Sequence, residues 1–310
     1  MLSNGSWGPV ISAGICIIHA INLPSGELLV WDRGVTILPD VFTTPSAKIL
    51  NPFTHTSAPA PNMANNMFCG GHAQLSTGDI LAAGGDIDPD LEWGTNLADI
   101  FTGTGWNNIS AVMWHERWYP SLISLPNGWI IVMGGAKKKD FPQQESSFVE
   151  EHEFYKPSTG TFVKLHSNAN RNVNWYPFVF VLPKAITING QYFRAGSFFF
   201  AGPYPKSAVL DWYAPVPFWS VDFADSQYNL HGTAVMYLPG KILKMCGQDS
   251  GQNQVWHIDM TQNYAGIPSW SPRAPMQIGR KDANVVILAD GTTLGVGGKS
   301  NSDGSVVLIP

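Results

Sequence analysis

Charged residues and cysteines are scarce in this sequence. Only 13% of its 310 residues are charged, and the formal net charge is -5. The one cationic run, 137–139, is typical of a solvated loop, so the charge pattern indicates no nucleic-acid surface. The three cysteines, Cys16, Cys69 and Cys246, lie in separate segments, which does not suit a disulfide framework. Without a Cys-x-x-Cys pair, the sequence also argues against a structural zinc site.

Long apolar runs are missing as well. No run approaches 18 residues, so we expect no membrane span. Residues 2–7 have neither the basic nor the apolar part of a signal peptide. Glycine (31 residues), proline (23) and aromatic residues (12%) are plentiful instead. Many turns and aromatic residues with little charge predict an all-β protein rather than a helical one.

One pattern repeats about every 50 residues: an apolar stretch, a Leu-Pro-x-Gly turn or a shorter form of it, a second apolar stretch and a Gly pair. The turn glycines are Gly26, Gly78, Gly128, Gly240 and Gly291. A weaker copy begins at Tyr176, and its turn is lengthened by residues 184–195. Each copy predicts a β-hairpin. Hairpins at this period, with further strands between them, predict a kelch-type β-propeller of four-stranded antiparallel blades.

The number of copies bears on how the propeller closes. Six copies are visible, and the sixth is followed by one more apolar stretch, 304–310. Residues 5–10 resemble the outer strand of a blade with no inner strands before it. Because an open edge strand invites pairing with other chains, we expect that strand to complete the last blade. We therefore interpret residues 1–310 as one propeller domain with six visible blades of seven, incomplete at its C-terminal end.

Equivalent positions in the blades should lie at equal height around the central axis. Counting back 15 residues from the first Gly of three pairs gives Cys69, Tyr119 and Asp282. The equivalent residues in the other copies are Ile17, Tyr176 and His231, the last uncertain by one position because its turn is shorter. Polar residues are ordinary at a wet channel mouth. However, Cys69 and Tyr119 fall in adjacent blades at the same height, where their side chains could touch. We expect Arg117, two residues before Tyr119, to line the axis too.

Two of these segments resemble a known family. MFCGGHAQLSTGDILAAGGD and ERWYPSLISLPNGWIIVMGG are similar to the galactose oxidase and glyoxal oxidase family of copper-radical oxidases. The Phe-Cys and Arg-Trp-Tyr motifs are the most diagnostic part, and the resemblance extends over essentially the whole chain. It implies that Cys69 forms a thioether with the ortho carbon of Tyr119 and that the Tyr119 phenolate ligates copper. Imidazole and phenolate suit Cu(II). Metal and radical would together take two electrons from a small alcohol, aldehyde or carbohydrate. O2 would then accept these electrons and be released as H2O2.

The sequence also departs from the family's pattern. The family has a Tyr-His pair in a later blade and a histidine ligand from a C-terminal β-sandwich domain, and nothing here matches either. We therefore expect these 310 residues to bind copper weakly, without turnover. Lys137 stands where galactose oxidase stacks a tryptophan on its radical tyrosine, which points away from galactose as substrate. We expect the other histidines (19, 55, 72, 115, 152 and 166) to be packing or surface residues.

The resemblance further implies a monomer in an extracellular or periplasmic location. Two alternatives stay open. The blades could serve as a non-catalytic kelch scaffold or a carbohydrate-binding propeller. Paired carboxylates for glycoside chemistry are also possible, because their pairing is spatial and leaves no sequence spacing.

Overall fold

The computed structural model describes residues 8–34, 36–38, 41–42, 45–88, 93–138, 147–224, 229–247, 253–300 and 304–307. These residues form β-strands and turns, with a short 3-10 turn at Ser167–Ala169 and no α-helix. Within these ranges no helix could therefore cross a membrane. The predicted all-β class is confirmed.

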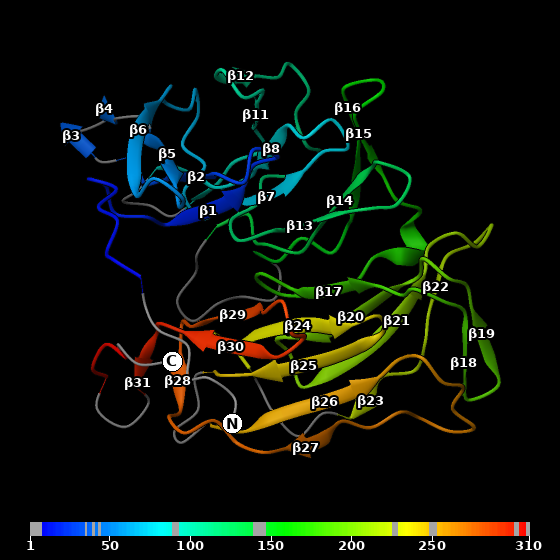
Figure 1. The fold of residues 1–310 in the computed structure, drawn as a ribbon. Helices are drawn as coiled ribbons and strands as arrows, with labels where there is room; N and C mark the ends of the chain where they lie inside the picture. Colours follow the sequence, from blue (N-terminus) through cyan, green and yellow to red (C-terminus); the bar gives the residue numbers. More distant parts are fainter. Residues whose placement is uncertain are drawn as a thin grey trace.

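Five antiparallel sheets form the blades of a β-propeller (Figure 1). The first contains β1 (His19–Asn22), β2 (Leu28–Trp31), β5 (Ala47–Asn51) and β6 (Thr56–Ala60). The second contains β7 (Gly71–Gln74), β8 (Ile80–Ala83), β11 (Ala98–Phe101) and β12 (Trp106–Asn108). The third contains β13 (Ser121–Ser124), β14 (Ile130–Met133), β15 (Glu153–Lys156) and β16 (Thr161–Lys164). The strand order in each sheet follows the chain, as expected for antiparallel blades.

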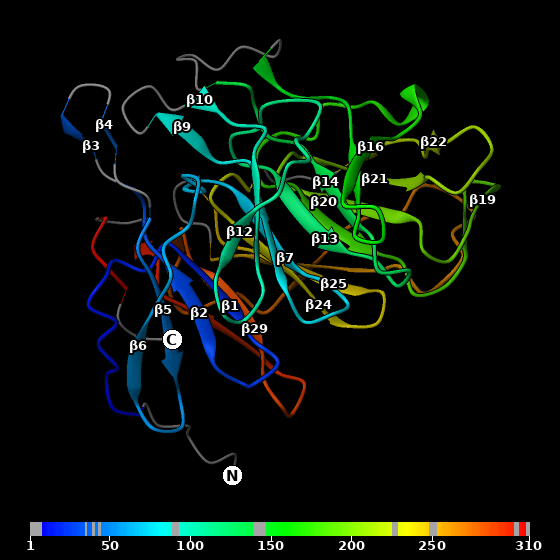
Figure 2. The same ribbon diagram turned by 90° about the horizontal axis from the view of Figure 1, so that it is seen from above.

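The last two of the five blades follow the same plan. The fourth contains β17 (Phe178–Val181), β20 (Phe198–Gly202), β21 (Lys206–Asp211) and β22 (Phe218–Trp219), and β23 (Phe223–Ala224) also pairs with β21. The fifth contains β24 (Thr233–Leu238), β25 (Lys241–Met245), β26 (Val255–Asp259) and β27 (Ser271–Arg273). Contacts between β7 and β13, β13 and β17, and β17 and β24 show that the first strands lie innermost. Figure 1 looks along the axis onto the ring of blades, and Figure 2 shows the same ring from its side.

The Gly-bearing hairpin turns are present as predicted. All five turn glycines have a positive φ, from 74° at Gly240 to 92° at Gly78. Residues other than glycine seldom adopt this conformation, which explains why glycine recurs here. Small hairpins are added between blade strands: β3 (Thr36–Leu38) with β4 (Val41–Phe42), and β9 (Asp86–Asp88) with β10 (Trp93–Gly94). The predicted insertion at 184–195 is a third, formed by β18 (Ile186–Ile188) and β19 (Gln191–Phe193).

The predicted count of six visible blades is not confirmed. After the fifth blade, β29 (Asn284–Ile287) pairs with β30 (Thr293–Val296), and β28 (Arg280–Lys281) pairs with β31 (Lys299–Ser300). These are separate two-stranded ladders, because no third strand joins β30 among the described residues. The expected closing strand at 5–10 falls partly outside the described ranges, and Gly8–Val10 are not in a strand. Of the stretch 304–310, the described part makes a single bridge, from Val306 to Lys299.

The core lies between the blades, around their second strands. Every residue of β8, β14 and β20 is buried. Such strands form continuous apolar runs because both faces of a blade pack against neighbours. Between the fourth and fifth blades, for example, Phe199 and Phe223 pack in one cluster with Ile242 and Ile258. The second strands of these blades are therefore held by packing on both faces.

We expect Gly134→Ala to destabilise the protein more than Gly160→Ala. Both glycines have nearly the same left-handed φ, 68° and 64°. An added Cβ at Gly160 meets no atom within 4 Å, whereas at Gly134 it collides with the Asn174 carbonyl oxygen and lies 2.8 Å from Pro177 Cδ. Gly160→Ala is the control and should lower the free energy of unfolding by about 1–2 kcal/mol through backbone strain alone. Gly134→Ala should lower it by at least ~3 kcal/mol. Equal losses in chemical denaturation would contradict the close packing of the third and fourth blades.

Candidate functional site

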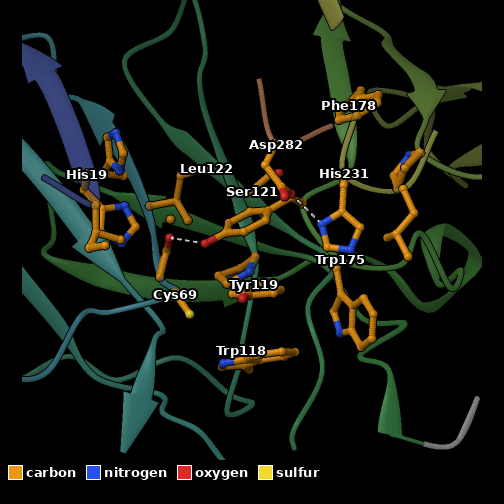
Figure 3. A pocket seen from close by; sticks show the side chains of 18 of the residues that line it. His19, Cys69, Trp118, Tyr119, Ser121, Leu122, Trp175, Phe178, His231 and Asp282 are labelled. Atoms are coloured by element: carbon orange, nitrogen blue, oxygen red, sulfur yellow. Dashed lines mark hydrogen bonds and ion pairs between the residues drawn. The ribbon is translucent and has the colours of Figure 1, made fainter. Parts of the chain in front are cut away.

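A pocket of about 770 Å³ opens where the innermost strands begin (Figure 3). The residues predicted to face the axis line it: Cys69, Tyr119, Tyr176, His231 and Asp282. Its walls also contain apolar side chains, among them Leu122 and Phe178. A pocket of this size, with apolar walls and a few convergent polar groups, suits a small-molecule ligand.

The five predicted residues share an unusual backbone conformation. Their φ angles are 62° at Cys69, 62° at Tyr119, 40° at Tyr176, 60° at His231 and 56° at Asp282. Each stands two residues before the first residue of β7, β13, β17, β24 or β29. Positive φ is uncommon for residues with a Cβ and tends to occur at functional sites. The shared conformation removes the one-residue uncertainty at His231. Ile17, the sixth predicted position, does not share it; its neighbour Ile18 lines the pocket instead.

Hydrogen bonds between these residues link the blades at the axis. The Tyr119 backbone N donates to the Cys69 carbonyl at 2.8 Å, and the Tyr176 N donates to the Tyr119 carbonyl at 2.8 Å. The Asp282 N donates in the same way to the His231 carbonyl at 2.8 Å. These bonds bring the side chains from neighbouring blades to one height. Cys69, which is buried, and Tyr119, which is partly buried, therefore face the same pocket.

Aromatic rings cover both faces of the Tyr119 phenol. The Trp118 ring stacks with it at 3.7 Å between centroids, and the Tyr176 ring stacks with it at 4.6 Å. The Trp175 ring meets it edge-on at 6.2 Å. Stacked rings restrict how the phenol can turn. Sequence reasoning compared only Lys137 with the family's stacking tryptophan and missed these partners. The repeated Trp-Tyr-Pro, at 118–120 and 175–177, was the available signal.

The Tyr176 side chain reaches across the axis. Its hydroxyl donates to the Gly70 carbonyl at 3.3 Å, next to Cys69. Burial of this hydroxyl, with added contributions from Cys69 and Tyr119, raises the Tyr176 pKa well above its usual value. Tyr176 therefore stays a neutral phenol at physiological pH and acts as a hydrogen-bond donor.

His231 and Asp282 form a pair on another side of the pocket from Cys69 (Figure 3). His231 Nδ1 lies 2.8 Å from Asp282 Oδ1, and both side chains are about half exposed. The hydrogen bond from His231 is the main reason that the Asp282 pKa is lowered. Asp282 is therefore a carboxylate near neutral pH.

His19 and His72 also line the pocket, which sequence reasoning did not predict. Their rings meet edge-on at 5.4 Å, and the His19 ring stacks on Trp31 at 5.0 Å. Burial, followed by the nearby His72, lowers the His19 pKa to about 3. Burial likewise lowers the His72 pKa to about 4. Both are therefore neutral imidazoles near pH 7. No spacing in the sequence marks them, because they come from two blades.

Arg117 does not line the axis as expected. It is fully buried within the third blade and is absent from the pocket wall. Its guanidinium lies 2.7 Å from Glu153 Oε1 and donates to the carbonyls of Gly134 and Glu151. Because a buried guanidinium must satisfy its donors, these three acceptors draw Arg117 away from the axis.

The described residues bring together few metal ligands. They contain no group of three or more His, Cys, Asp or Glu side chains able to hold a metal ion. In the pocket, Tyr119 offers a phenol oxygen, a suitable donor for Cu(II). A complete copper site at Tyr119 would therefore need donors beyond those that this part of the chain gathers.

Comparison with known proteins supports the fold. Among solved structures, the chain is similar to a novel fungal alcohol oxidase of the AA5 family, solved in complex with copper. The match has a TM-score of 0.72 and 20% sequence identity, and it covers 96% of this chain and 61% of that one. The chain thus spans about three fifths of the oxidase's length. No protein-family model matches the chain. No curated protein matches it either.

We expect His19 to make folding stability sensitive to acid. The folded His19 pKa is about 3, against about 6.5 in the unfolded chain. Between these values only the unfolded state binds the proton, so stability falls as the pH drops below about 6.5. The slope is about 1.4 kcal/mol per pH unit. His19→Phe should remove that contribution in urea denaturation between pH 6.5 and 4, whereas His55→Asn, at an exposed turn, should not. Parallel pH profiles of the free energy of unfolding for wild type and His19→Phe would contradict this prediction.

Proposed function

We propose that the chain is the propeller portion of a copper-radical oxidase acting on small alcohols or aldehydes. The observation that carries this proposal is the placement of Cys69 and Tyr119. They come from adjacent blades, share one backbone conformation and are joined by a 2.8 Å backbone hydrogen bond at the rim of the pocket. The fold shared with a copper-containing alcohol oxidase supports it. Because that oxidase is longer, the activity proposed here belongs to the whole protein.

The proposed cofactor is a thioether between Cys69 and Tyr119. Its formation breaks the Cys69 S–H bond and a ring C–H bond of Tyr119, and it makes one S–C bond. Two electrons and two protons leave, and O2 accepts them to give H2O2. The sulfur substituent extends the delocalisation of a phenoxyl radical and makes it easier to form. The stacked rings of Trp118 and Tyr176 hold the phenol in place and shield it from solvent.

Copper, when bound, would accept one electron while the Tyr119 radical accepts the other. Tyr119 is the residue proposed to hold it, through its phenolate oxygen. The neighbouring Tyr176 hydroxyl stays protonated, so it contributes a hydrogen bond instead of a second charge. We propose that the remaining copper ligands are not among the donor groups that the described residues bring together.

The pocket supports a small substrate with an apolar body. Phe178, Leu122, Pro203 and Leu230 supply apolar surface close to the polar residues. An alcohol or aldehyde carbon could approach Tyr119 from this side. Among the described residues, the pocket wall contains no Lys or Arg that would select a phosphorylated or strongly anionic substrate.

The thioether makes the proposal testable by mass. The full-length protein is treated with Cu(II) in air, digested and mapped. We expect a cross-linked peptide containing Cys69 and Tyr119, lighter than the sum of the separate peptides by two hydrogen atoms. Cys69→Ser and Tyr119→Phe should each abolish it. Cys246→Ser is the matched control, since that cysteine is buried elsewhere and should leave the link intact.

The opposite result has a clear meaning. Two separate peptides after copper treatment would reject the oxidase proposal. The non-catalytic scaffold or carbohydrate-binding propeller would then be favoured.

A further inference from the structure

We propose that His231 and Asp282 form an acid–base pair that takes the hydroxyl proton of a small alcohol bound in the pocket. His231 Nε2 is the proton acceptor, and Asp282 is a positioning residue that orients the imidazole. The assignment rests on the proposed oxidase function, because oxidation of an alcohol to an aldehyde requires a base for the O–H proton.

Two independent bonds fix the pair. The His231 Nδ1 and Asp282 Oδ1 atoms are 2.8 Å apart, and the Asp282 backbone N donates to the His231 carbonyl at 2.8 Å. Both residues are held in left-handed backbone, with φ of 60° and 56°. Strained backbone of this kind persists where the surrounding structure over-determines it, and it clusters at functional sites. The pair is therefore built into the segments that lead into β24 and β29.

The hydrogen bond sets the tautomer. A neutral imidazole has one N–H, and with Nδ1–H donated to Asp282 the lone pair lies on Nε2. Within the part of the chain that is described, no hydrogen bond is formed by His231 Nε2. The side chain is 47% exposed and lines the pocket, so a ligand can reach this atom. A carboxylate–imidazole pair with a free Nε2 is the arrangement of a general base.

The surroundings indicate what kind of ligand it would meet. Leu230 and Phe178 line the same pocket as the pair and give it apolar surface, while Cys69 lies on another side of it (Figure 3). A primary alcohol matches this arrangement, with its carbon chain on the apolar surface and its hydroxyl at His231. In the proposed step the O–H bond breaks, an N–H bond forms at Nε2 and the electron pair stays on the alcohol oxygen. The carboxylate of Asp282 stabilises the imidazolium.

Chemical labelling of the full-length protein tests the pair. Diethyl pyrocarbonate modifies unprotonated imidazole nitrogens, and peptide mapping reports each histidine separately. We expect Asp282→Asn to slow labelling of His231 by at least ~10-fold, because the asparagine amide donates to Nδ1 and leaves the proton on the exposed Nε2. Asparagine tolerates left-handed backbone, so this variant should fold. Asp290→Asn is the control, since that carboxylate lies exposed in the same hairpin and bonds only locally to Thr292.

The hydroxyl preference is tested with two probes. Benzyl alcohol should slow labelling of His231, whereas benzyl methyl ether, which lacks the O–H, should not. Labelling of His55 should respond to neither. In addition, 15N NMR of histidine-labelled wild type should show the proton of His231 on Nδ1. Equal protection by both probes, or a proton on Nε2, would overturn the proposal.

The same peptide map separates this proposal from the oxidase function. If benzyl alcohol protects His231 while Cys69 and Tyr119 stay unlinked, the hydroxyl site stands and the oxidase function fails. If the link forms but the two probes act alike, the oxidase function stands and the role of His231 is rejected.

Discussion

The backbone hydrogen bonds between successive blades at the axis are the constraint on which the site depends. Each bond joins two residues in left-handed backbone, such as Tyr119 and Cys69. The conformation costs about 1–2 kcal/mol per residue, and the apolar packing between the blades offsets that cost. Without this linkage, side chains from different blades would have no fixed height relative to one another. A pocket of reactive groups is therefore a consequence of the repeat itself.

The repeat places chemically different groups around one pocket. Tyr119 lies between stacked rings beside Cys69, which suits one-electron chemistry. The pair of His231 and Asp282 is half exposed and hydrogen-bonded, which suits proton transfer. Oxidation of an alcohol requires both kinds of group within reach of one carbon–oxygen bond. Such a division arises readily in a propeller, because each blade contributes one residue at the same position and these residues can vary independently.

The sequence predicted those parts of the structure that depend on local order. Hairpin length and turn glycines are read directly from the chain, so counting back from the Gly pairs found Cys69, Tyr119 and Asp282. Contacts between blades leave no such spacing. The stacking of Tyr176 on Tyr119 and the burial of His19 depend on how separate hairpins pack. The blade count was not confirmed, since a pattern of hairpins cannot show whether outer strands complete a sheet.

Arg117 shows why motif membership does not give a residue's role. It precedes Tyr119 by two residues, and alternation along an extended chain would place both side chains on one face. The left-handed turn at Tyr119 breaks that alternation, and Glu153 provides the buried counter-charge that Arg117 requires. Glu153 also accepts from the Trp114 backbone N–H, so it ties the segment before Tyr119 to the start of β15. Removing one partner of a buried pair typically costs about 3–5 kcal/mol. Arg117 therefore acts on Tyr119 through the backbone that carries it, and any effect on chemistry would arise from the position of the phenol.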